Sequence, residues 1–268
     1  GHGLGDGVQG FADIDGDGRP EFVRADRSGC HYATFYNLDG SVARNNGACA
    51  GHGLSDGPAE YVDVNGDGKA EFVTVASNGC HSMTFFDRRG EIARNSTSCG
   101  GHGLADGPRV FADVNGDGRA EYVTVGSNGC HAITFYTSTG NVASNRNLCG
   151  GHGLGDGPRE VIDANGDGRA EYVTMSSSGA HYRTSYSFKS DLLASVSNGM
   201  GGSVSVSYAP SSSWSNSNNP PIVPTVTSLT ESDGRGNSAT TSYSYSGGLW
   251  EHLDRRFLGF HYVRTIQP

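Results

Sequence analysis

Acidic residues recur along the chain in a nine-residue pattern that suits the binding of a divalent cation. The pattern reads Asp-x-[Asp/Asn]-Gly-Asp-Gly-[Arg/Lys]-x-Glu and begins at Asp13, Asp63, Asp113 and Asp163. Oxygens at alternate positions, with glycines that let the backbone wrap sharply, form the kind of cage that Ca²⁺ prefers. Mg²⁺ is less suitable because it resists dehydration and requires octahedral geometry. We therefore predict Ca²⁺ as the cofactor, with four sites, one in each copy of the pattern.

Each predicted site takes its ligands from positions 1, 3, 5, 7 and 9. Position 7 is Arg or Lys, which can contribute only its backbone carbonyl, and the other positions offer side-chain oxygens. The predicted ligands are Asp13, Asp15, Asp17, Arg19, Glu21, Asp63, Asn65, Asp67, Lys69, Glu71, Asp113, Asn115, Asp117, Arg119, Glu121, Asp163, Asn165, Asp167, Arg169 and Glu171. An EF-hand begins similarly, but its last glutamate stands at position 12 and helices flank it. The alternative is a metal-free turn, whose clustered carboxylates would repel one another.

The net charge of the chain is explained mainly by these loops. It is -9, and the first loop alone holds four carboxylates while each later loop holds three. Bound calcium would neutralise most of this charge, so the acidity belongs to local metal sites. Nucleic-acid binding is not expected, because it requires a basic face. A membrane span is not expected either, because no apolar run is long enough.

Six cysteines occupy the same two places in three successive copies: Cys30 and Cys49, Cys80 and Cys99, and Cys130 and Cys149. The fourth copy has Ala180 and Met200 there, so both members of the pair are missing together. This joint absence favours a disulfide within each copy over free thiols, and the spacing lacks the close Cys pair of a zinc site. Disulfides predict an oxidising compartment, which means a secreted or cell-surface location.

Histidines and aspartates also recur in register with the acidic pattern. The histidines are His2, His31, His52, His81, His102, His131, His152 and His181. They could bind Zn²⁺ or sense pH, but a repeated structural position, with one ring nitrogen bonded to a backbone carbonyl, is the favoured interpretation. The aspartates are Asp6, Asp56, Asp106 and Asp156. We expect them to cap turns, with a contact to a calcium ligand as the alternative.

The elements that must position these residues follow a fifty-residue repeat. The motif Gly-His-Gly-Leu-x-Asp-Gly divides residues 1–200 into repeats 1–50, 51–100, 101–150 and 151–200. The sequence of each repeat predicts four short strands. In the first copy these are Gln9–Ala12, Glu21–Ala25, His31–Tyr36 and Ser41–Asn45. The fold class is therefore all-β, with blades of the β-propeller type, and a solenoid of stacked hairpins is the alternative. Whether four blades close, or further repeats or subunits complete the structure, stays open.

Residues 201–268 form a separate strand-rich segment after the repeats end. Ser203–Tyr208 reads as a strand, and a Ser-, Asn- and Pro-rich stretch follows it. Thr225–Thr230 and Ser238–Tyr245 flank Asp233-Gly-Arg-Gly236, which predicts a β-hairpin. The aromatic tail at 254–263 should pack on a partner element. We expect the chain to be a piece or a processed product of something longer.

Two resemblances follow from these motifs. The acidic loops resemble the calcium loops of FG-GAP/VCBS repeats over residues 1–200. Residues 197–209, Pro220-Pro221, Val223-Pro224, 243–248 and 255–260 are similar to the segment after the FG-GAP region in the B component of bacterial Tc toxins and in SpvB-like proteins. In those families this segment leads into an Rhs/YD-repeat shell. The resemblance implies a large secreted or surface-delivered bacterial protein, in which the propeller serves for docking or scaffolding.

The favoured function is thus a secreted calcium-binding scaffold of a toxin-like or cell-surface protein, with a protein partner or neighbouring subunits. One alternative is a calcium-dependent lectin or adhesin that stacks a glycan on aromatics such as Phe35, Tyr36, Phe85, Phe86, Phe135 and Tyr136. Core packing between blades is the commoner use of such residues. Another alternative is a self-assembling extracellular fibre or shell. We expect no enzyme, because no nucleophile–base–acid motif stands out.

Overall fold

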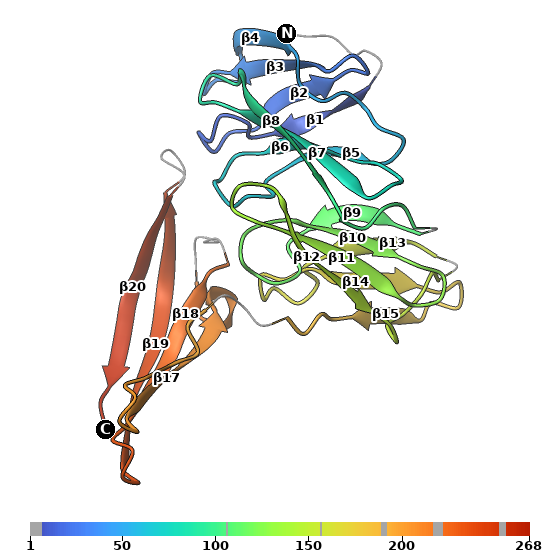
Figure 1. The fold of residues 1–268 in the computed structure, drawn as a ribbon. Helices are drawn as coiled ribbons and strands as arrows, with labels where there is room; N and C mark the ends of the chain where they lie inside the picture. The colour runs from blue at the N-terminus through green and yellow to red at the C-terminus, as the bar shows by residue number, and fades with distance from the viewer. Residues whose placement is uncertain (1–6, 106, 156, 189–191, 217–221, 252–255) are drawn as a thin grey trace. The chain divides into compact units, whose positions relative to one another are not determined.

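The computed structural model describes residues 7–105, 107–155, 157–188, 192–216, 222–251 and 256–268. The described chain is all-β except for one short 3₁₀ helix, η1 (Ser211–Ser213), and so confirms the predicted fold class (Figure 1). It separates into two compact units. The first comprises Gly1–Ile162 and Ala170–Tyr186, and the second comprises Asp163–Arg169 and Ser187–Pro268.

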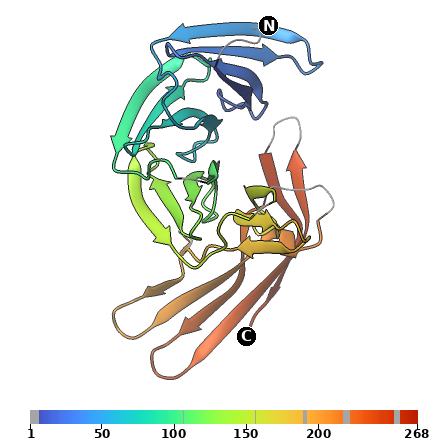
Figure 2. The ribbon, with the colours of Figure 1, turned by 90° about the vertical axis from the view of Figure 1, so that its right-hand side faces the viewer.

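The first unit is a series of small antiparallel sheets, one for each repeat, in which strands adjacent in sequence are also adjacent in space. We use the word blade for one such sheet with its loops, whether or not the series closes into a propeller. Figure 2 shows the first three sheets following one another in chain order. The strands of the first sheet are β1 (Val8–Ala12), β2 (Glu21–Ala25), β3 (Cys30–Tyr36) and β4 (Val42–Cys49). Those of the second are β5 (Ala59–Val62), β6 (Glu71–Val75), β7 (Cys80–Phe86) and β8 (Ile92–Cys99). Those of the third are β9 (Arg109–Ala112), β10 (Glu121–Val125), β11 (His131–Tyr136) and β12 (Val142–Leu148).

The fourth repeat differs from the expectation of four strands in one sheet. Its sheet holds β13 (Arg159–Ile162), β14 (Glu171–Met175) and β15 (His181–Thr184). The next strand, β16 (Ser195–Ser197), pairs with β17 of the second unit instead. The fourth repeat also lacks the cysteine pair that, in the other repeats, joins the third strand to the fourth. Among the described residues, the fourth blade is therefore three-stranded.

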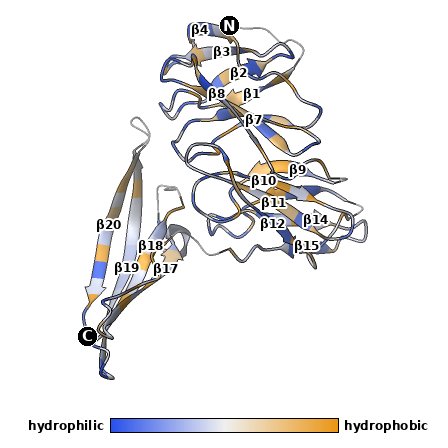
Figure 3. Ribbon diagram, in the orientation of Figure 1, coloured by the Kyte–Doolittle hydropathy of each residue, from blue (hydrophilic) through white to orange (hydrophobic). Residues whose placement is uncertain are grey.

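Apolar side chains between successive sheets form the core of the first unit. Between the first two sheets, Ile14, Val23 and Phe35 pack with Phe72 and Phe86. The next pair of sheets repeats this arrangement with Val73, Met83, Phe85, Phe111 and Tyr122. Apolar residues are prominent on β9 in Figure 3, and every residue of β10 is buried. Because these aromatic rings are buried between blades, the core interpretation holds for Phe35, Phe85, Phe86 and Tyr136, and they offer no sugar-stacking surface.

Disulfides close the outer hairpin of each of the first three blades. They join Cys30 to Cys49, Cys80 to Cys99 and Cys130 to Cys149, as the repeat pattern predicts. In the first two blades the paired cysteines stand directly opposite each other, at the start of the third strand and the end of the fourth. The hairpin between these strands turns at a glycine with positive φ, such as Gly40 at 80°, which explains the predicted Asp-Gly turn.

The second unit is built on a five-stranded antiparallel sheet. Its strands, in spatial order, are β16, β17 (Ser203–Pro210), β18 (Pro224–Ser232), β19 (Ser238–Glu251) and β20 (Arg256–Ile266). The predicted hairpin around Asp233 is confirmed as β18–β19. The aromatic tail pairs with β19 along β20, and the ring of Phe260 lies 4.9 Å from that of Tyr245. Residues 217–221 and 252–255, with part of the quoted proline motif and of the tail, lie outside the described residues.

No helix in the described parts of the chain has the length and apolarity that a membrane crossing requires.

The disulfide in the second blade offers a direct test of how much these crosslinks stabilise the fold. Replacing Cys80 and Cys99 together by Ser opens a loop with a sequence separation of 19. The chain-entropy model gives a loss of about 3 kcal/mol in the free energy of unfolding. Urea unfolding without reductant, followed by intrinsic fluorescence, measures it. The matched control is the Ala180→Ser/Met200→Ser variant, at positions without a disulfide. Equal midpoints for the two variants would contradict the prediction.

Candidate metal centres

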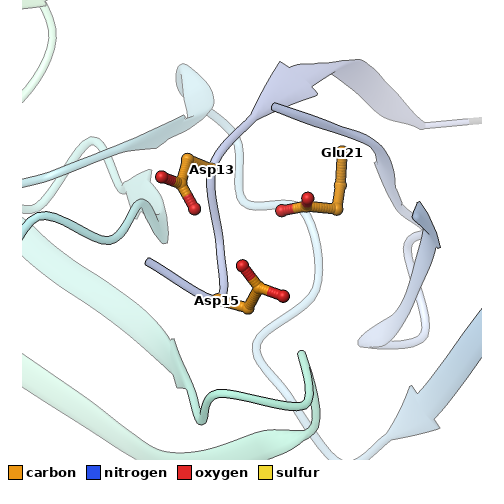
Figure 4. A group of neighbouring side chains, drawn as sticks. All are labelled: Asp13, Asp15 and Glu21. Carbon is orange, nitrogen blue, oxygen red and sulfur yellow. The ribbon is translucent and has the colours of Figure 1, made fainter. Parts of the chain in front are cut away.

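The first acidic loop, which connects β1 to β2, brings three of its predicted ligands together. Carboxylate oxygens of Asp13, Asp15 and Glu21 all lie within 4.8 Å of one another. Figure 4 shows the three side chains converging from both sides of the loop. The arrangement provides several hard oxygen donors around one point, which is the donor chemistry of a divalent cation such as Ca²⁺.

Backbone N–H groups and glycines give the loop its shape. The carboxylate of Asp13 accepts hydrogen bonds from the N–H groups of Gly16 (2.7 Å) and Gly18 (2.6 Å). Both glycines have positive φ, 78° and 80°, which residues with a side chain rarely adopt. The same pair of bonds forms at Asp63, Asp113 and Asp163. The first aspartate of each pattern therefore organises the backbone of its loop.

The glutamate at position 9 is buried in every repeat. One oxygen of Glu21 accepts the N–H of Ile14 at 3.0 Å, and Glu71 and Glu121 accept the equivalent N–H groups of Val64 and Val114. The remaining oxygen of each glutamate faces its own loop. In the second loop it accepts a hydrogen bond from the Asn65 amide at 3.0 Å. The sequence pattern predicted the glutamate, but its bond to the backbone N–H of the residue after the first aspartate becomes visible only in the fold.

Burial and neighbouring carboxylates make these acids costly to ionise without a cation. Burial, followed by the charges of the loop aspartates, raises the pKa of Glu21 and of Glu71 to about 8 and that of Glu121 to about 9. Burial likewise raises the pKa of Asp15, and the charges of Asp17 and Asp13 add to this effect. A divalent cation would remove this penalty because it favours the charged form. The residues present therefore fit a bound metal ion.

Positions 5 and 7 pair with each other in the first three loops. Asp17 forms an ion pair with Arg19, Lys69 Nζ lies 3.1 Å from Asp67, and Asp117 forms an ion pair with Arg119. The long side chain at position 7 thus holds the aspartate at position 5, a partnership that the sequence reasoning did not anticipate. The carbonyl of position 7 as a metal ligand stays a prediction.

The fourth loop repeats the local hydrogen bonds but is divided between the two units. Asp163, Asn165, Asp167 and Arg169 belong to the second unit, whereas Glu171 belongs to the first. Within the loop, the N–H of Asp167 donates to Asn165 at 2.8 Å and the N–H of Arg169 donates to Asp167 at 2.9 Å. The role of this loop as a fourth metal site stays a prediction.

The acidic loops also contact the next blade. The backbone carbonyl of Asp13 accepts a hydrogen bond from Ala70 N at 2.7 Å, and Asp63 and Asp113 make the same bond to Ala120 and Ala170. Gly16 lies so close to the stem of Lys69 that a Cβ there would approach Lys69 Cγ to 2.8 Å. A change in loop conformation would therefore be transmitted to the contact between blades.

Three histidines occupy a repeated structural position between blades, as expected. The Nε2 atoms of His31, His81 and His131 lie 2.9, 2.8 and 2.8 Å from the backbone carbonyls of His52, His102 and His152. A carbonyl only accepts, so Nε2 carries the proton in each case. Because the structure engages both nitrogens of each ring, these three histidines leave no atom for Zn²⁺. His181 is exposed, and His2 lies outside the described residues.

The second partner of each buried histidine is a tyrosine hydroxyl from the next blade. Tyr136 and Tyr186 donate to Nδ1 of His81 and His131 at 2.6 and 2.8 Å. At the first boundary, Phe86 stands in place of this tyrosine, and Tyr61 supplies the hydroxyl from another strand at 3.0 Å. The fifty-five-residue spacing of His81 to Tyr136 and of His131 to Tyr186 is a sequence signal that could have revealed this contact.

Of the repeated aspartates, Asp56 behaves as expected for a turn-capping residue. Its Oδ1 accepts the N–H of Ser77 at 3.1 Å, in the turn between β6 and β7. Asp6, Asp106 and Asp156 lie outside the described residues.

The buried histidines should stay neutral well below the usual pH of histidine titration. Burial lowers the pKa of His31 to about 4 and also lowers the pKa of His81 and His131. We therefore expect the imidazole Cε1–H signal of His31 to keep its neutral chemical shift at pH 5.5 in a two-dimensional NMR titration, and those of His81 and His131 to titrate below the usual range. The same chain in urea is the control, because unfolded histidines titrate near 6.5. Titration of all histidines near 6.5 in the folded chain would contradict this expectation.

Comparison with known proteins finds a family match over the C-terminal part of the chain. Residues 154–268 match the family model of the insecticide toxin TcdB middle/N-terminal region. No curated protein matches the chain. The family match supports a relationship of residues 154–268 to the Tc toxin B component.

Solved structures with a similar fold include three crystal structures of TcdB2-TccC3. The structure of TcdB2-TccC3 gives a TM-score of 0.64 at 18% identity and covers 98% of this chain and 19% of that one. The TcdB2-TccC3-TEV structure gives 0.62 at 17% identity, covering 97% and 18%. The structure without the hypervariable C-terminal region gives 0.60 at 21% identity, covering 77% and 11%. The chain thus spans a fifth or less of the length of these structures, and the similarity concerns the fold.

Proposed function

We propose that this chain is a calcium-stabilised structural and docking module of a larger, secreted toxin-like protein. The observation that carries the proposal is the match of residues 154–268 to the TcdB middle/N-terminal region. The similar fold over 98% of the chain supports it. The three disulfides agree with an extracellular location.

The contacts between blades support a scaffolding role over a catalytic one. Three blades are each crosslinked by a disulfide, and His31, His81 and His131 hold successive blades together through both ring nitrogens. Groups that often serve as acids and bases in enzymes are here engaged in structural bonds. We therefore propose that the module presents a stiff surface to protein partners and performs no reaction of its own.

Calcium would stabilise this scaffold at the acidic loops. In the first loop, Asp13, Asp15 and Glu21 are the residues that would hold the ion, and the equivalent positions of the other repeats would hold one ion each. Bound Ca²⁺ supplies positive charge to buried carboxylates that otherwise repel one another. Because Asp13 also bonds to the next blade, calcium in the loop would stabilise the contact between blades. These loops are the feature that supports membership in the FG-GAP/VCBS type of repeat.

Calcium should raise the thermal stability of the chain, and a chelator should lower it. A site filled at 100 times its dissociation constant adds about 2.7 kcal/mol to the free energy of unfolding. For a domain of this size, 1 kcal/mol corresponds to roughly 2–4 °C. Calorimetry with calcium and with EGTA measures the shift, and titration calorimetry should give one ion per loop. An unfolding midpoint that does not respond to calcium would contradict the proposal.

The variant Glu71→Gln sharpens this test because its effect should depend on calcium. With calcium, Glu71→Gln should lose about as much free energy of unfolding as one bound calcium ion adds. In EGTA it should be neutral or stabilising, since it removes a buried carboxylate from a crowded acidic loop. The matched control is Asp39→Asn, an exposed acid in a hairpin turn, whose calcium response should equal that of the unchanged chain. Destabilisation by Glu71→Gln that is equal with and without calcium would point to a metal-free structural role.

The docking role can be tested with the protein that accompanies TcdB2 in the solved structures. We expect the chain, immobilised in calcium, to bind a purified protein of the TccC3 type with a dissociation constant below about 10 μM, a value that corresponds to roughly 7 kcal/mol. Biolayer interferometry measures it, and the chain unfolded by EGTA and reductant is the control. Absence of binding, together with binding to a glycan array, would favour a lectin instead.

A further inference from the structure

The boundary between blades is built from the same positions three times. One blade contributes a histidine at the start of its third strand. The next blade contributes an aromatic face, which we call the docking face and define by four repeated positions. In the first blade these positions are Phe11, Phe22, Tyr36 and Val42, and in the third blade they are Phe111, Tyr122, Tyr136 and Val142.

The docking face of the first blade is exposed where its counterparts are buried. Phe11 is 69% exposed, whereas Phe111 and Val161 are each 9% exposed. Phe22 is half-buried, whereas Phe72, Tyr122 and Tyr172 are fully buried. Val42 is 46% exposed. The first blade therefore presents to solvent the apolar surface that every later blade presents to its predecessor.

The first blade also carries the tyrosine of this contact. Tyr36 stands at the position of Tyr136 and Tyr186, whose hydroxyls donate to His81 and His131 of the preceding blade. The connecting segment that begins each repeat is likewise present, as Gly1-His2-Gly3-Leu4. In the later repeats, the carbonyl of the histidine in this segment accepts the second bond of the preceding blade's histidine. The first repeat therefore contains the residues that both hydrogen bonds to a preceding histidine require.

We propose that the docking face of the first blade binds a preceding blade of the same repeat type, joined in series to the Gly-His-Gly-Leu segment. The third strand of that blade begins with a histidine, whose Nδ1 accepts a hydrogen bond from the Tyr36 hydroxyl. Apolar residues two and four positions later, as in Ala33 and Phe35, cover Phe11 and Phe22. This proposal rests on the boundaries between blades and does not depend on calcium or on the toxin context.

A second copy of this chain is a poorer occupant than a further repeat. The face it would offer belongs to the fourth blade, which has Arg183 and Ser185 where the first has Ala33 and Phe35. Arg183 is exposed, and docking would bury its charge against apolar rings without a compensating acid on the docking face. The fourth blade therefore has the polar outer face of a terminal repeat, and the first blade does not.

One internal contact cannot form at the proposed boundary. Ala70 N donates to the carbonyl of Asp13, but Pro20 stands at this position in the first blade and has no N–H. The apolar face and the tyrosine–histidine bond would therefore carry the contact. The boundary should be weaker than the internal ones, and replacing Pro20 by Ala should strengthen it.

The test adds a copy of residues 51–100 in front of Gly1, which recreates the Cys-Gly-Gly-His-Gly-Leu junction found at 99–104. We expect amide hydrogen exchange in β1 and β2 to slow at least roughly tenfold relative to the unextended chain. The unfolding midpoint should rise by several degrees. A second extension, made from residues 101–150, should act in the same way, and failure of both extensions to fold or to protect β1 would overturn the proposal.

Exchanging the hydroxyl between its two possible positions tests whether docking uses the bond described above. In the extended chain, Tyr36→Phe should remove most of the added protection while keeping the ring. Adding Phe11→Tyr to Tyr36→Phe should restore it, because the first boundary already uses the pair Tyr61 and Phe86 in this way. In the unextended chain neither change should matter, which provides the matched control. If adding Phe11→Tyr did not restore the protection against exchange, this result would contradict the proposed contact.

Two observations on the unextended chain would also overturn the proposal. One is slow exchange of β1 and β2 at the level of β6, since this would mean that another part of the chain already covers the docking face. The other is a dimer in light scattering that Phe11→Arg dissociates, since this would identify a second copy as the occupant. A monomer with rapid exchange in β1 is the result we expect.

Discussion

A sheet of four short strands cannot bury both of its faces, and this constraint governs the first unit. The second and third sheets each cover one face with the sheet before and the other with the sheet after. Phe72 and Phe35, for example, are buried by each other's blades. The stability of such an array comes from its boundaries as much as from its repeats. Hydrogen bonds that His31 donates, that the Asp13 carbonyl accepts and that their counterparts form then fix the register of this apolar contact.

The acidic loops stand at these same boundaries. Their first aspartate shapes the loop through its side chain and reaches the next blade through its carbonyl. Their last residue is a buried glutamate that begins the second strand of the sheet. The loop thus continues into its own sheet at both ends and is hydrogen-bonded to the neighbouring blade through its first residue. This placement explains why a repeat protein would combine a charged loop with an otherwise apolar boundary.

Periodicity made the local features predictable, whereas contacts between distant residues were less so. The repeat predicted the strands, the hairpin turns and the cysteine pairs, because these depend on residues within one copy. The carbonyl partners of the histidines were also expected as a class. The tyrosine partners were not, since Phe86 interrupts the pattern and Tyr61 replaces it from another strand. The pairing of β16 with β17 was missed for a similar reason, as a short Ser-Val-Ser strand does not specify its sheet.

The crosslinked hairpins limit how far the chain can be extended. Each disulfide connects residues separated by 19 positions, from the first residues of one strand to the end of its neighbour. A fully stretched segment of that length would span about 65 Å. With the bond intact, a pulled chain bypasses this segment and carries it as a closed side loop. The contour length of the oxidised chain is therefore much shorter than its residue count suggests, and reduction alone releases the difference.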